Sequence, residues 1–241
     1  MRALFRVAYA GYAGVTFLAL SLVALAAVII TPGLERRRGI VRATARLFLR
    51  LAGMPLVVRG IEQLPSGQCV VVANHASYLD GLVFSAALPP RFGFVIKREM
   101  AGVPLAGSML RRIGSEFVER FNRGKGASDA RRVLRNAASG HSLVFFPEGT
   151  FSSRPGLLKF HSGAFITAAR AGCPVVPAVV RGTRAALAPD RPLPRPALIE
   201  VEILPAVVAT RSEPEAASAE LRELARAAIL SHLDEPDLAV A

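Results

Sequence analysis

A histidine and an aspartate five residues apart are the first side chains in this sequence that could do chemistry. His75 and Asp80 follow an apolar run, residues 71–73, that stops at Asn74. If the run is a strand and a helix starts near residue 77, both side chains lie at the carboxyl edge of a sheet, where open α/β sheets bind ligands. A histidine that removes a proton from a hydroxyl needs a partner that fixes its tautomer and stabilises the imidazolium, and Asp80 could serve. The ordinary alternative is a helix-capping aspartate beside a surface histidine.

Two further apolar runs end in arginine. The stretch 114–123 is strand-like and ends in Arg120 and Arg123, which could bind a phosphate or form a solvated basic turn. A later strand contains Pro177 and ends at Arg181. Proline inside a strand indicates an edge strand or a bulge, and bulges are common near sites.

A glutamate follows a third buried strand. The run at 143–146 meets Pro147, Glu148 and Gly149. Proline stops the sheet ladder, and glycine lets the backbone approach a ligand closely. A glutamate in this place is costly to bury without partners, which favours a site, although an ordinary β-turn has the same composition.

The elements that must position these residues alternate between short strands and helices. We expect strands at 55–59, 68–73, 93–97, 115–119, 142–146, 175–181 and 198–204, and helices at 78–88, 103–112, 126–139, 161–171 and 215–232. Several strands are continuous apolar runs, as in a sheet covered on both faces. The sequence therefore predicts an α/β fold with a mixed, largely buried β-sheet flanked by helices.

A long apolar segment precedes this domain. Residues 7–31 form a run of 25 residues without a charge. A helix of that length would rise roughly 37 Å, enough to cross a bilayer core of about 30 Å. Basic residues are more numerous after the run than before it, which places the downstream domain on the cytoplasmic side of the inner membrane. A cleaved signal peptide, with a small-x-small pattern at 24–26, is the alternative, and spanning and re-entrant forms both stay open.

The next segment carries a row of arginines. Arg38, Arg42, Arg46 and Arg50 recur every four residues and so share one helical face. We interpret this helix as lying in the membrane interface, with the arginines toward anionic head groups. The alternative is an amphipathic helix packed on the domain. The two N-terminal helices together would form a membrane-anchoring unit at residues 1–52, followed by a catalytic domain at 53–212 and a helix with a tail at 213–241.

Composition narrows the partners. The formal net charge is +12 and 52% of the residues are hydrophobic, which suits nucleic acid, anionic lipid or a phosphorylated substrate. Nucleic acid is the weakest of these, because no aromatic stacking platform accompanies the arginines. Cys69 and Cys173 are expected to be reduced core thiols. The four histidines lack metal-ligand spacing, so we expect no metal site.

Taken together, the strand-end motifs resemble those of the glycerolipid acyltransferases typified by bacterial 1-acylglycerol-3-phosphate acyltransferase. The family's four blocks correspond here to Asn74, His75 and Asp80; Gly114, Phe117, Val118 and Arg120; Phe146, Pro147, Glu148, Gly149, Thr150 and Ser152; and Val175, Val176, Pro177 and Ala178. Two linking segments of the family appear as residues 97–99 and 159–165. The resemblance covers roughly residues 50–205, and the family also has N-terminal membrane helices.

The resemblance implies acyl transfer from acyl-CoA or acyl-carrier protein to the hydroxyl of 1-acylglycerol 3-phosphate at a membrane, with no cofactor beyond the acyl donor. It agrees with His75 as general base and Asp80 as the residue that orients it. It further implies that the phosphorylated acceptor is held by Lys97, Arg120, Glu148, Gly149 and Thr150. Additional phosphate or acyl contacts could come from Asn74, Arg98, Arg154, Lys159, Pro177 and Arg181.

Two departures from the family pattern stand out. Phe151 occupies the place of an arginine that helps to hold the acceptor's phosphate, and Glu119 occupies the place of an aspartate. Arg154 or Lys159 could replace the lost cation. Otherwise the acceptor differs, for example a lyso-ornithine lipid, another lysophospholipid or glycerol 3-phosphate. Two other classes stay open: a lipid esterase or thioesterase with the same dyad, and a non-catalytic lipid-binding membrane protein.

Overall fold

Seven strands form one sheet in the part of the chain that the computed structural model describes, residues 2–119, 123–191 and 193–239. The strand order is β1-β7-β6-β2-β5-β3-β4. The strands are β1 Leu56–Arg59, β2 Val70–Ala73, β3 Gly93–Lys97, β4 Glu116–Val118, β5 Leu143–Phe145, β6 Val175–Arg181 and β7 Ile199–Ile203. Each lies within a predicted strand, so the mixed α/β fold is confirmed.

Strand direction decides where the polar segments meet. β6, β2, β5, β3 and β4 run parallel to one another, whereas β7 is antiparallel to β6 and parallel to β1. Parallel neighbours present their carboxyl ends at the same edge of the sheet. The segments that follow β2 and β5, which contain His75 and Glu148, therefore lie side by side.

The expectation that Pro177 marks an edge strand is wrong, whereas the alternative of a bulge agrees with the pairing on one side of β6. β6 lies between β7 and β2, and its register with β2 is unbroken from Val175 to Ala178. On the other side Ala178 pairs with Ile203 but Val175 pairs with Val207, so the register shifts by one residue across Pro177, whose carbonyl accepts a hydrogen bond from the backbone N–H of Leu204. The missing N–H of proline thus falls at the break between the Val175–Val207 bridge and the β6–β7 ladder.

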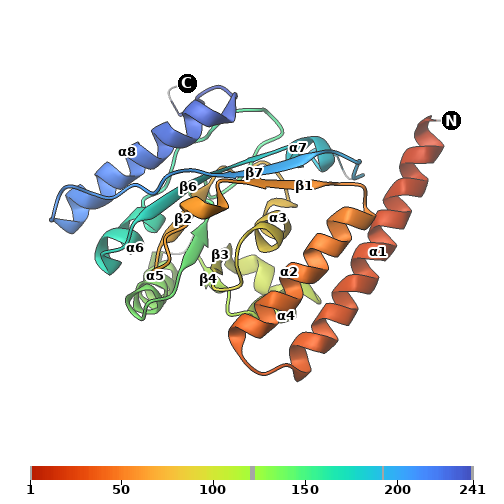
Figure 1. Ribbon diagram of the computed structural model, residues 1–241, viewed down its shortest axis with the longest axis horizontal. Helices are drawn as coiled ribbons and strands as arrows, with labels where there is room; N and C mark the ends of the chain where they lie inside the picture. Colours follow the sequence, from red (N-terminus) through yellow and green to blue (C-terminus); the bar gives the residue numbers. More distant parts are fainter. Residues whose placement is uncertain (1, 120–122, 192, 240–241) are drawn as a thin grey trace.

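Helices cover both faces of the sheet (Figure 1). They are α1 Arg2–Ile30, α2 Leu34–Leu51, α3 Asp80–Ala87, α4 Ala106–Arg112, α5 Arg123–Ala138, α6 Gly163–Ala171, α7 Thr183–Ala186 and α8 Pro214–Leu233, with short 3₁₀ helices at Ile61–Gln63 and Arg98–Gly102. Alternate β2 side chains enter different cores, since side chains along a strand alternate between faces. Val71 and Ala73 pack with α2 and α3, and Val70 and Val72 pack with α6 and α8. Cys69 and Cys173 are free and buried, as predicted.

The N-terminal helices α1 and α2 lie side by side (Figure 1). The hydroxyl of Tyr9 on α1 donates to the Ala52 carbonyl just beyond α2, at 2.7 Å. Among the described residues, Leu4–Ile30 is the one helix long and apolar enough to cross a membrane. Large apolar side chains along it are exposed, including Val15 at 70% and Val23 at 66%.

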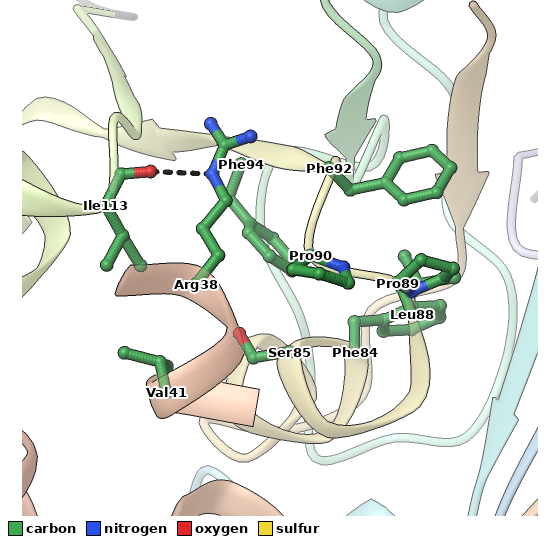
Figure 2. Close-up of a pocket in the computed structure, with 10 residues that line it drawn as sticks. All are labelled: Arg38, Val41, Phe84, Ser85, Leu88, Pro89, Pro90, Phe92, Phe94 and Ile113. Carbon is green, nitrogen blue, oxygen red and sulfur yellow. Dashed lines mark hydrogen bonds between the residues drawn. The ribbon is translucent and has the colours of Figure 1, made fainter. Parts of the chain in front are cut away.

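Arg38 on the arginine face of α2 lies inside the domain, so the interpretation that this face meets lipid head groups is wrong for Arg38, whereas Arg46 and Arg50 are exposed. Arg38 is buried, and its Nε donates to the Ile113 carbonyl at 2.8 Å (Figure 2). The Nε of Arg46 donates to the Ala86 carbonyl in the last turn of α3, at 2.7 Å. Carbonyls at helix ends lack intrahelical partners and favour cations, which explains both contacts. The cavity beside Arg38 measures about 20 Å³, room for about one water molecule.

Candidate active site

His75 and Asp80 form a direct pair at the carboxyl edge of the sheet. The Nδ1 atom of His75 lies 2.7 Å from Oδ2 of Asp80. The same oxygen accepts hydrogen bonds from the backbone N–H groups of Ala76 and Ser77, at 2.6 and 2.9 Å. Asp80 is fully buried at the first residue of α3, where the positive end of a helix favours a carboxylate. Because Asp80 accepts the Nδ1 proton, the neutral ring keeps its basic lone pair on Nε2.

Glu148 ties the segment after β5 to the segment after β2. One carboxylate oxygen accepts the backbone N–H of His75 at 2.6 Å, and the other accepts that of Leu158 at 2.8 Å. The side chain is only 3% exposed. Gly149, at φ 73°, allows the tight turn in which its N–H bonds the Phe146 carbonyl. Glu148 thereby fixes the backbone that carries the histidine.

Burial raises the pKa of Glu148 to about 7, although the N–H groups of Leu158 and His75 oppose the rise. The folded protein therefore binds this proton more tightly than the unfolded chain, whose carboxyl has its usual pKa of 4.5. The free energy of unfolding should fall by about 3 kcal/mol as the pH rises from about 4.5 to about 7, since the folded state must release the proton in this window.

Melting temperatures of the detergent-solubilised protein, measured from pH 5 to pH 8, would test this. Glu148→Gln is expected to remove that fall, and Glu223→Gln, on an exposed side chain, should keep it. An identical pH dependence of the melting temperature in the wild type and Glu148→Gln would contradict the assignment of this stability change to Glu148.

Aromatic rings enclose the histidine. The Phe146 ring stacks on His75 with centroids 4.5 Å apart, and the Phe151 ring lies 4.4 Å away at a tilt of 59°. Tyr78, 68% exposed, meets Phe151 edge to face at 4.8 Å. The sequence marked Phe151 as a missing arginine but not as a ring against His75. The available signal was the presence of aromatic residues within the two motifs, at positions 78, 146 and 151.

Several predicted contact residues serve the fold in this structure. Asn74 is buried, and its side-chain amide both donates to and accepts from the backbone of Val180, at 3.0 and 2.8 Å, which braces β2 against β6. Arg181 pairs with Glu202 on β7 at 2.9 Å. Pro177 lies within the β6 ladder. The predictions that these three contact phosphate or acyl groups have no support from their positions.

Among the described residues, the predicted cations other than Arg181 end or follow strands β3 and β5. Lys97 ends β3, and its Nζ is 3.2 Å from Glu99. Arg98 binds both carboxylate oxygens of Asp129 on α5. Thr150, Arg154 and Lys159 are exposed in the segment after β5. Arg120 lies outside the described residues.

The sequence matches the family model described as Acyltransferase over residues 55–181, just over half of the chain. The matched region contains the His75–Asp80 pair and Glu148. The chain belongs to the acyltransferase family. The resemblance found in the sequence motifs is thereby confirmed.

Curated relatives of this acyltransferase share its central region. A 1-acyl-sn-glycerol-3-phosphate acyltransferase of Saccharomyces cerevisiae is 31% identical over 153 residues, 61% of this chain and 50% of the relative. One of Haemophilus influenzae is 31% identical over 123 residues, 51% of each chain. A chloroplast one of Brassica napus is 34% identical over 128 residues, 52% of this chain and 37% of the relative. This chain thus spans about half or less of the length of the curated relatives it matches.

The acyltransferase also shares its fold with a solved structure. The crystal structure of the 1-acyl-sn-glycerophosphate acyltransferase of Thermotoga maritima superposes with a TM-score of 0.79, covering 96% of this chain and 97% of that one. The sequence identity is 21%, so the likeness concerns the fold.

Proposed function

We propose that this acyltransferase moves a fatty acyl group from acyl-CoA or acyl-carrier protein to the free hydroxyl of 1-acylglycerol 3-phosphate, giving phosphatidate. The observation that carries the proposal is the 2.7 Å contact between His75 Nδ1 and a fully buried Asp80. It leaves Nε2 of a partly exposed imidazole as the base. The activity for which the curated relatives are named supplies the substrate class.

In this mechanism Nε2 of His75 takes the proton of the acceptor hydroxyl as its oxygen attacks the thioester carbonyl. Asp80 stabilises the imidazolium and holds the ring in position. When the tetrahedral intermediate collapses, the carbon–sulfur bond breaks and the leaving thiolate takes the proton back from the imidazolium. The hydroxyl reacts directly with the thioester, so no serine or cysteine nucleophile is required, and the sequence has no Gly-x-Ser-x-Gly elbow.

The acceptor's phosphate would lie at the carboxyl edge of β3, β4 and β5. Lys97, Arg120 and the turn formed by Glu148, Gly149 and Thr150 are the proposed contacts, with Arg154 and Lys159 as further cations. The apolar α1 supports binding to the inner membrane, with the catalytic domain on the cytoplasmic side because of the basic residues after it. The corresponding parts are an anchoring unit at 1–52, a catalytic domain at 53–212 and a C-terminal helix and tail at 213–241.

An acceptor panel tests the proposal. Membranes that contain the wild-type protein, and matched membranes that lack it, receive labelled oleoyl-CoA or acyl-carrier protein with one candidate acceptor or none. We expect labelled phosphatidate with lysophosphatidate and no product without an acceptor. Transfer only to a different lyso-lipid would refute the proposal that lysophosphatidate is the acceptor. Release of fatty acid without an acceptor would indicate a hydrolase.

A second acceptor class is favoured by one observation, the Phe151 ring against His75. The position that carries a cation in the family carries an apolar ring here. A lyso-lipid without a phosphate monoester, such as a lyso-ornithine lipid, would need no cation there. The acceptor panel distinguishes the two classes directly.

Phe151→Arg is expected to lower the KM for lysophosphatidate by about tenfold, because a hydrogen bond between charged groups contributes about 1.5–3 kcal/mol and part of this is offset by the lost ring contacts. The KM for an uncharged acceptor, such as monoacylglycerol, should not fall. Phe151→Leu is the matched control, since it removes the ring without adding charge. Equal changes in KM for both acceptors would show that residue 151 does not contact the phosphate.

A further inference from the structure

Residues 235–238, which follow α8, return to the loop that follows Glu148. The backbone N–H of Leu157 donates to the Pro236 carbonyl, and that of Leu238 donates to the Leu157 carbonyl, both at 2.9 Å. Leu157 and Asp237 are paired as in a parallel bridge, and Leu157 is fully buried. We refer to residues 235–238 as the C-terminal strap.

Two ion pairs fix the strap to helices of the domain. Arg226 on α8 binds both carboxylate oxygens of Asp237, at 2.7 and 2.5 Å. Arg184 on α7 pairs with Glu235 at 3.0 Å. The arginine side chains are only 15% and 14% exposed. A two-point arginine–carboxylate pair with partly covered side chains, such as Arg226–Asp237, holds its geometry better than an ordinary surface ion pair.

The strap and the loop are packed too closely for a side chain at Gly156. A Cβ there would lie 2.4 Å from the Leu238 side chain and 3.0 Å from the Pro236 carbonyl oxygen, and φ is 139°. The Gly156 N–H donates to Glu235 at 2.7 Å. The loop therefore has little freedom to shift while the strap is in place.

Two hydrogen bonds to Glu148 connect this loop to the backbone of His75. Leu158, the residue after the bridge, donates its N–H to one oxygen of Glu148, and the other oxygen accepts the N–H of His75. Arg184 adds a second connection, because it also donates to the carbonyls of Ser152 and Arg154 in the same loop.

We propose that the C-terminal strap is a positioning element of the active site, with Arg226 and Asp237 as its positioning residues. Through Leu157 and Leu158 it holds Glu148, and through Glu148 it holds the backbone of His75. The inference rests on the proposed acyl transfer at His75 and adds residues far along the chain to the same site.

Asp237→Ala is the test variant, because it opens the ion pair and leaves in place the charged groups that act on Glu148, namely Asp80, Arg184 and Arg226, together with the backbone N–H of His75. With the acceptor that the wild type uses, kcat is expected to fall on the order of tenfold. That is less than the ~100-fold that a 1 Å misplacement of a reacting group can cost. The KM for the acyl donor should stay within about twofold, because the strap acts on positioning rather than on donor binding.

The pH profile separates positioning from a general loss of stability. The Leu158 N–H lowers the pKa of Glu148, so releasing the loop should raise that pKa. Because the Glu148 carboxylate holds the His75 backbone, the decline of kcat on the acid side of the profile should then begin at higher pH. Arg226→Met should give the same fall and the same direction of shift. Arg222→Met is the matched control on α8, since Arg222 pairs with the neighbouring exposed Glu223, and it should behave as the wild type. A shift in Arg226→Met with none in Asp237→Ala would show a direct charge effect and overturn the proposal.

Hydrogen exchange tests the same series of contacts, from the strap through Glu148 to His75, without relying on catalysis. In Asp237→Ala the amides of residues 156–158 and of residues 75–77 should both exchange faster than in the wild type. Faster exchange at 156–158 with no change at 75–77 would overturn the proposal even if no acceptor in the panel reacts. If the wild type transfers no acyl group to any acceptor, but Asp237→Ala shows faster exchange at both 156–158 and 75–77, the proposed function would be refuted and the strap's positioning role would remain supported.

Discussion

His75→Ala is expected to lower kcat by on the order of 100-fold or more, because the acceptor hydroxyl then has no base within the site to take its proton. The His75 backbone N–H still donates to Glu148, so the turn should persist. Loss of the imidazole removes the ring between Phe146 and Phe151 but leaves both rings attached to their own elements. Initial rates of labelled product, at saturating donor and acceptor and equal amounts of membrane-bound protein, would measure the effect.

His141→Ala is the matched control. His141 is exposed and precedes β5, so it lies toward the opposite edge of the sheet from His75, and its removal should leave the rate unchanged. A His75→Ala protein that retains more than about a tenth of the wild-type rate, with intact melting behaviour, would mean that another group acts as the base.

The central strands β2, β5 and β6 could be predicted because each contains a short apolar run, and burial on both faces is what such runs require, whereas β7 could be predicted from its alternation of apolar and acidic residues. Within that pattern even β4, with three residues, was found. The short α7 was not predicted, since four residues are too few to show a helical period. Its backbone turn follows Gly182 at φ 84°, a local feature without a hydrophobic pattern.

Periodicity also has a limit that the arginines of α2 illustrate. A four-residue repeat shows that Arg38 and Arg46 share a face, but it does not show what that face contacts. Their partners are backbone carbonyls of Ile113 and Ala86, distant in sequence. Every residue has such a carbonyl, so no residue type in the sequence indicates these partners.

For the site, too, the sequence predicted the positions of residues at strand ends but not their contacts with distant parts of the backbone. The strand-end positions of His75, Asp80 and Glu148 placed them at one edge of the sheet, and the geometry brings them together. Glu148's role as a link depends on the backbone N–H groups of His75 and Leu158, and no residue type signals such contacts. Arg181 fitted the pattern of a phosphate-binding strand end equally well, yet its partner is Glu202 on the antiparallel neighbour. That pairing depends on the order of strands, which the local sequence does not contain.

Asp80→Asn should be nearly as damaging as loss of the histidine, with kcat lowered on the order of 100-fold or more. The asparagine oxygen can take the place of Oδ2 and accept from His75, Ala76 and Ser77, so the ring orientation can survive. Its amide nitrogen then falls at the position of Oδ1, a buried atom with no hydrogen-bond partner among the described residues. The negative charge that stabilises the imidazolium is lost, so the proton transfer becomes less favourable even with the geometry intact.

The charge argument can be separated from a packing argument by combining the two variants. If Asp80 acts through His75, the double variant His75→Ala/Asp80→Asn should be no slower than the slower single variant, because groups that act as a unit are strongly non-additive. Asp190→Asn, at an aspartate whose side chain is 61% exposed, is the matched control and should keep the wild-type rate. Multiplicative losses in the double variant would show that Asp80 contributes independently of the imidazole. In that case its three hydrogen bonds to residues 75–77 would serve the fold of the turn rather than the chemistry of the base.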